Sequence, residues 1–456
     1  FEALTYEAVE GAEYVEFNGN VMTILDTAMA NKTVVVDVKN SAGNVVKTFT
    51  YTLVLEASFE VVGNPLIGES VEFVITSNLP AERFTIEILE GGEFATLNGN
   101  FVMIHEDAVD GSVIKVKVGS TADENWGEVL EFVVGKKEVN AEKTLLAKGD
   151  AGKDVAYIGQ AALDLSETEV DLQKLTKVIL DGVETTDYTI SGNVITFNNP
   201  APGTHAIVFE TTAVKYNASI CFYGHSVSTV AELEAWRTSN PLAYTVLLND
   251  IDAQGATLAA TDVWHEGILD GLGHTISNFK MITAFVYALN GSAAIKNLQL
   301  VNFIQDCSAM NWDNKFGVVC GENNNGTIEN VYVEVAFGGN GYAATVPNAG
   351  IVANGRSGSI TGCLVVDKSA ATYTNTGLIV GMMQNNMDLS ANAYVSTKHS
   401  TVTNANGKTL TAAVKVDSVA DLFADANATI KSKLTMLSLN GSDVMWGNFK
   451  IATISA

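Results

Sequence analysis

Three isoleucines recur at almost fixed spacing in the second half of the chain. Ile295, Ile328 and Ile360 differ by 33 and 32 positions, and each opens a short apolar segment. The segments between them end in Gly/Asn-rich turns. Such a period is typical of a solenoid, in which a repeat buries its apolar face only against its neighbours. The spacing therefore predicts a parallel β-helix around residues 269–380.

Two segments are predicted to form short helices that cover the ends of this solenoid. Residues 227–240 contain Thr229 and Glu232 at the spacing of a capping box, with Val230, Leu233 and Trp236 at helical spacing. Residues 418–430 have a helical pattern as well. The open ends of a solenoid must be shielded from water and from further stacking, which these helices would do.

A second repeat lies in the N-terminal part of the chain. Residues 5–28 return as residues 85–108 with a constant offset of 80 and no gap, and an Asn-Gly-Asn turn (residues 18–20 and 98–100) recurs within them. Alternating apolar residues and Asn-Gly turns predict antiparallel strands. A unit of about 80 residues with short strands is typical of an immunoglobulin-like β-sandwich.

The second copy begins near Ala57 with two strands that the first copy does not contain. We therefore expect a partial sandwich over residues 1–56, complete sandwiches over 57–136 and 137–224, and the β-helix with its capping helices over 225–456. The start at Phe1 in mid-domain suggests a processed or excised piece of something longer. The alternative is that a neighbouring subunit supplies the missing strand, so that the protein self-associates through the incomplete sandwich.

The charge pattern excludes one class of partner. The chain carries 52 acidic and 26 basic residues, a net charge of −26, of which residues 1–224 contribute −20 and residues 225–456 contribute −6. Nucleic-acid binding requires clustered Lys and Arg, so we expect no nucleic-acid partner. The acidity suits an extracellular surface. Membrane insertion is not expected, because no apolar run approaches the roughly 20 residues that span a bilayer.

The cysteines do not form a recognisable framework. Cys221, Cys307, Cys320 and Cys363 lack the density of a disulfide scaffold and the spacing of a zinc site. We expect them to be small apolar residues, three of them stacked inside the coils. A contact between Cys320 and Cys363 in neighbouring coils is left open, as is its redox state.

The C-terminal half contains three further motifs. They are the segment "ELEAW…YTVLLNDID" from Glu232, the coil "LDGLGHTISNF" from Leu269, and G-x-x-x-G strands (Gly317 to Gly321 and Gly377 to Gly381) that alternate with I-x-N or I-x-G-C strands. With these motifs, residues 227–456 resemble the β-helix domains that carry GLUG-type repeats in bacterial surface proteins. The sequence departs from the pattern where Gly350 is followed by Asn354 instead of a second glycine.

The N-terminal half resembles bacterial immunoglobulin-like stalk modules. Together the two resemblances imply an all-β chain of tandem sandwiches followed by a right-handed β-helix. They also imply a surface-exposed adhesive protein of an anaerobic bacterium, or a virion protein of a phage that infects one. Neither resemblance carries a catalytic signature or a cofactor to this sequence.

Carboxylates in the first coils raise the alternative of a β-helix carbohydrate-active enzyme. Asp250 and Asp252 share a face by alternation, and Asp270 and His274 lie in one coil. Asp270, however, belongs to an Asp-Gly turn of the kind that a sharp corner requires. No basic cluster accompanies these residues to stabilise a uronate. We therefore predict no catalytic residue, although a paired-carboxylate site is what such an enzyme would need.

Other candidate sites are weak. The segment 322–326 lacks the regular aspartate spacing of a calcium loop, so we expect asparagine ladders and left-handed corners instead of a metal site. Trp312, Tyr342 and Tyr373 fall in or near the longer loops and are the candidate binding residues, because aromatic rings can stack on sugars. Core packing is the alternative role for each of them.

These patterns favour a non-enzymatic extracellular protein of a bacterial or virion surface. An acidic stalk would present a β-helix that binds a host or cell-surface glycan or protein. One alternative is a structural subunit of a phage fibre or bacterial filament, which would leave an open groove and a C-terminal strand near Phe449 free to pair elsewhere. The other alternative is the carbohydrate-active enzyme, with carboxylates lining one face.

Overall fold

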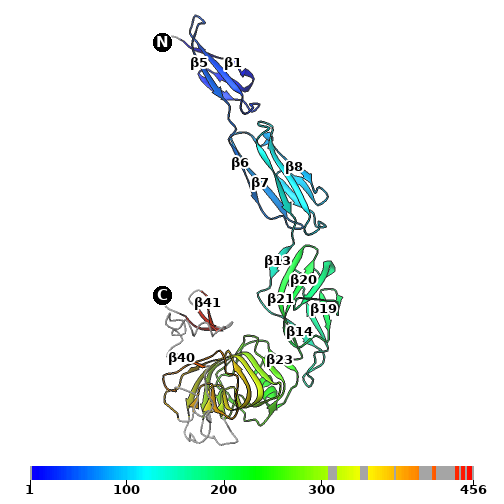
Figure 1. Cartoon of the computed structure of the whole chain (residues 1–456), viewed down its shortest axis with the longest axis vertical. Coiled ribbons are helices and arrows are strands. Elements are labelled where there is room, and N and C mark those ends of the chain that lie inside the picture. The colour runs from blue at the N-terminus through cyan, green and yellow to red at the C-terminus, as the bar shows by residue number, and fades with distance from the viewer. Residues whose placement is uncertain are drawn as a thin grey trace.

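The computed structural model of the chain describes residues 3–306, 316–338, 348–373 and 376–399, and the short strands 413–416, 437–440, 443–446 and 449–453. The chain is all-β and elongated, with a row of sandwiches that leads to a wider coiled region (Figure 1). The predicted fold class, tandem immunoglobulin-like sandwiches followed by a parallel β-helix, is confirmed.

The first unit consists of a three-stranded sheet of order β1-β4-β5 and a separate hairpin, β2-β3. The strands are β1 (Thr5–Glu10), β2 (Val15–Asn18), β3 (Val21–Ile24), β4 (Thr33–Lys39) and β5 (Val45–Thr52). Side chains alternate across a strand, so β4 turns Val34, Val36 and Val38 toward the core, and all three are buried. The 3₁₀ turn η1 (Ala12–Tyr14) joins β1 to β2.

The second unit is a complete two-sheet sandwich. One sheet has the order β6-β7-β10-β9 and the other β12-β11-β8. The elements are β6 (Ala57–Val62), β7 (Ser70–Ser77), η2 (Ala81–Arg83), β8 (Phe84–Glu90), β9 (Ala95–Asn98), β10 (Phe101–Ile104), β11 (Val113–Ser120) and β12 (Gly127–Val133). The hairpin β6-β7 is the part without a counterpart in the first unit, as the offset of 80 predicts.

Hydrogen bonds join the first two sandwiches. Arg83 extends from η2 and donates from Nη2 to Ala28 O (3.0 Å) and from Nη1 to Asp26 O. The amide of Ala30 donates to Ala122 O at 2.7 Å. The stalk is therefore held at this joint by backbone contacts as well as by the chain connection.

The third unit is a single nine-stranded sheet that folds around its own core. Its elements are β13 (Lys137–Asn140), β14 (Leu145–Gly149), β15 (Gln160–Asp164), η3 (Leu172–Lys174), β16 (Leu175–Leu180), β17 (Val183–Thr185), β18 (Tyr188–Ser191), β19 (Val194–Asn198), β20 (Gly203–Thr211) and β21 (Val214–Tyr223). The short hairpins are antiparallel, whereas β13 and β14 both run parallel to β21. Strand β21 thereby links the two sides of the unit.

The β-helix is built from parallel pairings alone within its main sheet. The strands of its longest row are β22 (His225–Val227), β23 (Tyr244–Leu247), β27 (Ile268–Asp270), β31 (Ala294–Asp306), β33 (Cys320–Gly338), β36 (Leu364–Asp367), β39 (Asn392–Val395) and β40 (Ala413–Val416). Ile295 pairs with Ile328, and Ile328 pairs with Ile360, in direct register. All three are fully buried, which confirms the period that the sequence predicts.

Shorter strands complete the coils. They are β24 (Ile251–Asp252), β25 (Thr257–Leu258), β26 (Trp264–His265), β28 (Thr275–Ser277), β29 (Lys280–Met281), β30 (Val286–Asn290), β32 (Phe316–Gly317), β34 (Asn348–Ala349), β35 (Val352–Thr361), β37 (Thr376–Gly377) and β38 (Val380–Met383). Strands β32, β34 and β37 form a small parallel sheet of their own.

The glycine pattern lies in a different register from the one that the sequence suggests. Gly317 pairs with Ala349, and Ala349 pairs with Gly377. The middle coil therefore has an alanine, not Gly350, at the first position of its G-x-x-x-G strand. Gly350 is required for another reason, because a Cβ there would lie 2.3 Å from Leu378 O. The expected match of Gly350 and Asn354 to the glycine pair is thus wrong.

The predicted helix at the start of the β-helix is confirmed. Helix α1 (Val230–Thr238) begins with a capping box, in which Thr229 accepts from the amide of Glu232 at 3.2 Å and the Glu232 carboxylate accepts from the amide of Thr229 at 3.0 Å. Leu233 and Trp236 are buried in the core of the β-helix. The helix therefore covers the first coil. The second predicted helix, 418–430, lies outside the described residues.

The last strands do not continue the parallel row. Strands β41 (Leu437–Asn440), β42 (Asp443–Trp446) and β43 (Phe449–Thr453) form an antiparallel sheet, in which Phe449 pairs with Trp446. The strand near Phe449 is thus paired within the chain, on one of its edges. The filament alternative expected this strand to be free to pair with another chain. That expectation is wrong for the edge of β43 that pairs with β42.

The three cysteines that the structure describes are buried free thiols. Cys320 Sγ donates to Glu322 O (3.0 Å) and Cys363 Sγ to Thr361 O (3.4 Å), so these two thiols have separate backbone partners. Burial raises the pKa of both thiols to about 12. They behave as small apolar residues, as predicted. Cys307 lies outside the described residues.

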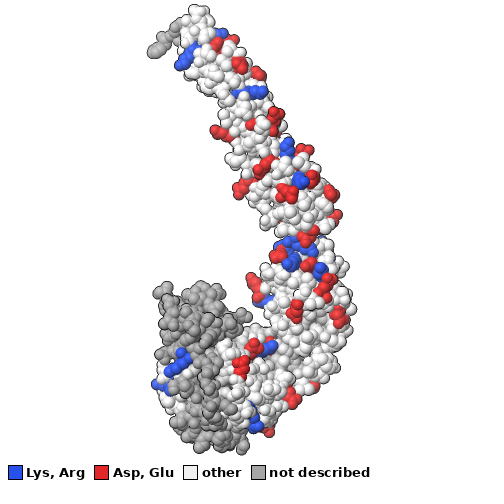
Figure 2. Space-filling model, in the orientation of Figure 1, with Lys and Arg blue, Asp and Glu red and all other residues white. Residues whose placement is uncertain are grey.

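Charged side chains of both signs are spread along the stalk, and in the view shown a group of Lys and Arg side chains gathers where the second sandwich meets the third (Figure 2). Acidic residues outnumber basic ones along the sandwiches, as the sequence requires. Among the described residues, no helix has the length and apolarity to cross a bilayer.

Candidate functional site: the loop side of the β-helix

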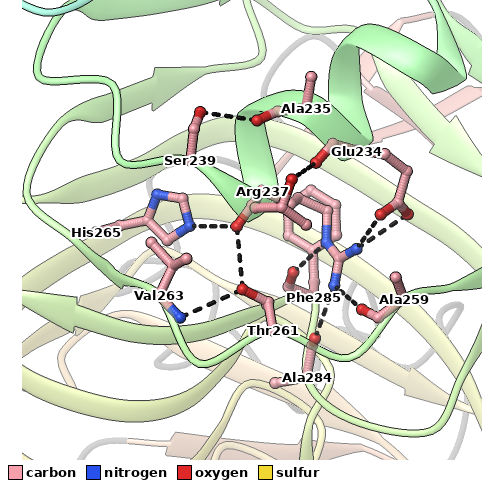
Figure 3. A network of polar contacts seen from close by, with 11 residues as sticks. Glu234, Ala235, Arg237, Ser239, Ala259, Thr261, Val263, His265, Ala284 and Phe285 are labelled. Atoms are coloured by element: carbon pink, nitrogen blue, oxygen red, sulfur yellow. Dashed lines mark hydrogen bonds and ion pairs between the residues drawn. The ribbon is translucent and has the colours of Figure 1, made fainter.

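A buried arginine network closes the first coil (Figure 3). Arg237 extends from the last turn of α1 and is fully buried. Its Nη2 donates to Ala259 O (3.1 Å) and Ala284 O (3.4 Å), and its Nε donates to Phe285 O. Nη1 forms an ion pair with Glu234 at 2.8 Å. The guanidinium thus satisfies carbonyls that a buried coil edge would otherwise leave unpaired.

His265 joins this network from β26. Its Nε2 donates to Arg237 O (3.1 Å), and its ring stacks on Trp236 with centroids 4.6 Å apart. A carbonyl only accepts, so Nε2 carries the hydrogen. Burial lowers the pKa of His265 to about 4, with the nearby Arg237 charge acting in the same direction. The network is therefore a structural cap with a neutral histidine, in which Arg237 and His265 are buried and only part of the Glu234 side chain reaches the surface.

The carboxylates of the first coils hold turns. Asp250 Oδ1 accepts from His274 Nδ1 (3.1 Å) and from the amide of Thr275 (2.9 Å). Asp252 Oδ1 accepts from Gln254 N at 2.9 Å. Asp250 thus joins its corner to the next coil, and Asp252 does so as well, because it also accepts from Asn278 Nδ2 at 2.8 Å.

Asp270 is the most enclosed of these carboxylates. It is fully buried and accepts from the amide of Leu272 (2.9 Å), from Asn297 Nδ2 (3.0 Å) and from the Tyr244 hydroxyl. Lys296 Nζ lies 3.8 Å from it. Since three donors and a cation surround it, its geometry is that of the corner residue predicted from the Asp-Gly turn.

Asparagine ladders run along the corners of the β-helix. Asn330 Nδ2 donates to Asn297 Oδ1 (2.8 Å), and Asn324 Nδ2 donates to Asn290 Oδ1 (2.9 Å). Asn325 has a φ of 73°, in the left-handed region. The ladders and left-handed corners expected for the segment 322–326 are therefore confirmed. In the described residues there is no group of three or more His, Cys, Asp or Glu side chains that could hold a metal ion.

Four neighbouring strands of the β-helix end on one side. Asp306 of β31 pairs with Gly338 of β33, Val335 pairs with Asp367 of β36, and Val366 pairs with Val395 of β39. The connections that follow, residues 307–315, 339–347, 368–375 and 396–412, all leave from this edge. We call this edge the loop side, represented among the described residues by Phe337, Asp367, Ser369, Tyr373, Ser396 and His399.

A buried aspartate–histidine pair organises the loop side. Asp367 Oδ2 accepts from His399 Nδ1 and from Ser396 Oγ, each at 2.6 Å, and Oδ1 accepts from the amide of Ser369 at 2.9 Å. Burial raises the pKa of Asp367, but the hydrogen bonds from His399, Ser369 and Ser396 outweigh it and hold the pKa at about 2. The carboxylate is therefore ionised.

The histidine of this pair has both nitrogens engaged. Its Nε2 accepts from the amide of Tyr373 at 2.9 Å, so the hydrogen lies on Nδ1, which faces Asp367. Ser396 Oγ donates to Asp367 and not to His399. The three residue types of a hydrolase triad are present, but the nucleophile–base hydrogen bond that such a triad needs is not made. The arrangement fixes two connections of the loop side to each other.

Tyr373 is the one sequence-predicted binding residue that the structure describes. Its ring stacks on His399, with centroids 6.2 Å apart and planes inclined by 20°, and it packs in part against the core of the β-helix. Phe337 meets the same imidazole edge-on at 5.7 Å. Trp312 and Tyr342 lie outside the described residues, within the connections that leave from the loop side.

Sequence reasoning missed Arg237 and the Asp367–His399 pair. Arg237 follows Val230 and Leu233 at helical spacing and so lies on the apolar face of α1, which is an available signal. Val366 pairs with Val395, an offset of 29, so Asp367 and His399, which are 32 positions apart, lie in successive coils but not at the same position of each.

Comparison with known proteins does not assign a family. No protein-family model matches the chain, and no curated protein matches it. Among solved structures, it is similar to the Bacteroides ovatus mixed-linkage glucan utilization locus SGBP-B, in complex with a mixed-linkage heptasaccharide (13% identity, TM-score 0.16, 50% of this chain and 64% of that one). It is also similar to domains 4–9 of the surface layer protein SbsC (13% identity, TM-score 0.17, 48% and 39%).

A third similar structure is the N-terminal four immunoglobulin domains of Dscam1 isoform 6.9 (8% identity, TM-score 0.16, 48% of this chain and 69% of that one). The match covers less than two thirds of the first two of these proteins. These neighbours are multi-domain all-β surface or extracellular proteins.

Proposed function

We propose that the chain is a non-enzymatic extracellular adhesin or surface-display protein. An acidic stalk of immunoglobulin-like sandwiches presents the β-helix, whose loop side binds a glycan or protein of a host or neighbouring cell. The observation that carries this proposal is the alignment of β31, β33, β36 and β39, whose ends lie on one edge and lead into four successive connections.

A rigid support for these connections favours binding. Solenoids present extended lateral surfaces, and insertions in successive repeats gather on one face. Binding residues are often carried on loops that a rigid scaffold positions. The ionised Asp367 and its partner His399 hold two of the connections together. The connections therefore lose less conformational entropy when a ligand binds.

The candidate ligand contacts are Trp312, Tyr342 and Tyr373. They fall in three different connections of the sequence, and only Tyr373 is among the described residues. A carbohydrate is a suitable ligand, because an aromatic ring can stack on a sugar. A protein surface is the other ligand class that the proposal allows.

The proposed location is the surface of a bacterium. The acidic stalk supports it, because a like-charged rod stays soluble and extended. The resemblance of residues 227–456 to GLUG-type β-helix domains of bacterial surface proteins also supports this proposed location.

A structural subunit of a bacterial filament or phage fibre is the second candidate. The observation in its favour is the elongated row of sandwiches (Figure 1). Strand β43 pairs with β42 on one of its edges, which weakens the other argument for it.

Glycan-array binding of the whole chain tests the main proposal. We expect binding of a defined glycan class, and a loss of at least about tenfold in affinity when Trp312, Tyr342 or Tyr373 is replaced by alanine. Tyr157→Ala is the matched control, because Tyr157 is 61% exposed in the third sandwich, away from the loop side. Its affinity should equal that of the parent.

Two results would contradict the proposal. Equal losses for the control and the loop-side variants would place binding elsewhere. The second result is that the bound glycan becomes shorter during incubation, as measured by size-exclusion chromatography or mass spectrometry. This would favour the alternative function of a carbohydrate-active enzyme. Loss of that cleavage in Asp250→Asn or Asp270→Asn would then identify its carboxylates.

A further inference from the structure

A groove opens between the two sheets of the second sandwich. It has a volume of about 580 Å³ and lies between β7 and β8, which belong to opposite sheets (Figure 1). Phe73 and Ile75 line it from β7, and Phe84 and Ile86 line it from β8. Pockets that bind ligands commonly measure about 300–1,000 Å³. The groove is therefore large enough for part of another molecule, and these two walls are apolar.

The opposite side of the same sandwich is closed by an aromatic side chain. Trp126 packs edge-on against Phe59 (6.1 Å) and Phe84 (5.0 Å), and its Nε1 donates to Ala57 O at 3.2 Å. The indole therefore covers the core between β6 and the start of β12. On the groove side the hairpin β9-β10 covers only part of the core, because β10 begins at Phe101 opposite Glu72.

The edge of β7 that borders the groove is unpaired beyond Phe73. Strand β10 pairs with β7 only over Ser70–Glu72, and Phe73 N donates to Asn100 O (2.9 Å) in the turn. Amide groups alternate between the two edges of a strand, so those of Ile75 and Ser77 point to the same side as that of Phe73. Within the part of the chain that the structure describes, no strand pairs with that side of Ile75 and Ser77.

Strand β8 has an open edge on the other wall. Among the described strands it pairs only with β11, and Thr121 N donates to Arg83 O on that side at 2.8 Å. By the same alternation, the backbone groups of Phe84 and Ile86 point away from β11. Both walls thus offer main-chain donors and acceptors beside apolar side chains. This combination suits an extended polypeptide, which can pair along a strand edge, better than it suits a glycan.

The groove lies in an acidic part of the stalk. Residues 57–136 contain 14 Asp and Glu but only four Lys and Arg. Glu82 lines the groove, and Glu72 lies at its end, where it accepts from Asn100 Nδ2 at 3.2 Å. Arg83 is directed instead to carbonyls of the first sandwich. A basic partner is therefore favoured, whereas the acidic stalk of a second copy would be repelled.

We propose that this groove binds an extended, basic segment of a partner protein by strand addition to β7. The segment continues the line of β10, antiparallel to β7, and its main chain pairs with Ile75 and Ser77. Alternate apolar side chains of the segment fill the space between Ile75 and Ile86, and its Lys or Arg side chains face Glu82. The site belongs to the stalk and does not depend on the ligand of the loop side.

A synthetic peptide tests this site in the whole chain. The probe is an acetylated and amidated octapeptide, KVTVKVTK, in which valine alternates with lysine or threonine. We expect saturable binding by isothermal titration calorimetry, and amide hydrogen exchange at Ile75 and Ser77 that is slower by at least about tenfold. The affinity should fall as salt is added. The acidic analogue EVTVEVTE should bind at least about tenfold more weakly.

Three variants of the chain locate the binding. Ser77→Trp places an indole in the groove and should abolish binding of KVTVKVTK. Ser58→Trp is the matched control, because Ser58 is exposed and lies next to the inward-facing Phe59 on β6, so its affinity should equal that of the parent. Glu82→Lys changes an exposed residue and should weaken binding of KVTVKVTK by at least about fivefold while it strengthens binding of EVTVEVTE. Unchanged amide exchange in β11 reports that each variant is folded.

Four outcomes would overturn the proposal. The first is that KVTVKVTK does not bind the parent chain. The second is that a folded Ser77→Trp variant binds it as tightly as the parent. The third is that EVTVEVTE binds equally well, or that Glu82→Lys changes neither affinity. The fourth is that Ile75 is protected in the chain alone, to a degree that rises with protein concentration, which would make a second copy the occupant.

Discussion

Asn330 lies in the coil next to Asn297 and donates from Nδ2 to Asn297 Oδ1 at 2.8 Å. Asn297 in turn donates to Asp270 Oδ1 at 3.0 Å. The two asparagines have φ values of 54° and 51°, which place both in the left-handed region. Glycine can adopt this backbone, but only a residue with an amide side chain can also extend the ladder. The corner thus uses one residue type for two purposes.

Replacing Asn297 separates these two contributions. We expect Asn297→Ala to lower the free energy of unfolding of the β-helix by about 2–3 kcal/mol, because it loses ladder hydrogen bonds and strains the backbone. Asn297→Gly should cost only about half as much, since glycine accepts the positive φ. Urea denaturation followed by tryptophan fluorescence measures both. Equal losses for the two variants would show that the backbone conformation contributes nothing.

The pH dependence of stability should depend on His265. Its pKa is about 4 in the folded chain and about 6.5 when unfolded, so the unfolded chain binds more protons between these values. Stability is therefore full above pH 6.5 and falls as the pH drops toward 4, by on the order of 3 kcal/mol. His265→Gln removes this contribution. The measurement is the thermal midpoint of the β-helix from pH 7 to pH 4.

His105→Gln is the control for this experiment. His105 lies in the second sandwich, so its replacement should leave the slope of the β-helix transition unchanged. Burial also lowers the pKa of His225, which adds to the slope of every variant alike. The difference between the parent and His265→Gln isolates His265, and parallel curves for the two proteins would refute its role.

Arg237 should be among the most sensitive positions of the β-helix. Arg237→Met keeps much of the stem but leaves three carbonyls and the Glu234 carboxylate without their donor, so we expect a loss of about 3–5 kcal/mol. Arg237→Lys should recover only part of it, because an ammonium cannot reproduce the planar fork. Lys280→Met, at an exposed position on β29, is the control. A loss below about 1 kcal/mol for Arg237→Met would contradict the network.

Gly317 and Ala349, which pair in register, should differ in whether a methyl group is tolerated at the position. A Cβ at Gly317 would lie 1.9 Å from Cys320 O, so Gly317→Ala should cost more than about 2 kcal/mol of stability. Ala349→Gly, one coil away, should cost only about 1 kcal/mol. Gly92→Ala, where no atom lies within 4 Å, should be neutral. Chemical denaturation of the three variants tests this order, and tolerance of Gly317→Ala would show that the coil relaxes there.

The sequence predicts the elements that depend on local pattern or on period. The spacing of Ile295, Ile328 and Ile360 becomes the register of three stacked strands, and the pair Thr229 and Glu232 becomes a capping box. Both follow from rules that involve one segment or a constant offset. The offset of 80 similarly identifies the hairpin β2-β3 as the equivalent of β9-β10.

What the sequence does not predict depends on close approach between distant segments. The glycine register is misplaced because Gly350 is needed for its own contact with Leu378, which no spacing reveals. The burial of Arg237 is set by carbonyls of residues 259, 284 and 285, from two later turns of the coil. The loop side is predicted only as a place for aromatic residues, and the Asp367–His399 pair that fixes it appears only when successive coils are stacked.

The passage from stalk to β-helix takes a single residue, Gly224, between the end of β21 and the start of β22. Its amide donates to Tyr244 O (3.0 Å), and Ala243 N donates to Lys153 O (3.1 Å), so the third sandwich and the first coil are fastened on both sides of the crossing. Bending there would break these bonds and open the small core of Cys221, Tyr223, Tyr244 and Val246. A force applied to the loop side is consequently transmitted to the stalk through a rigid connection. The orientation of the stalk therefore sets the direction in which the loop side faces.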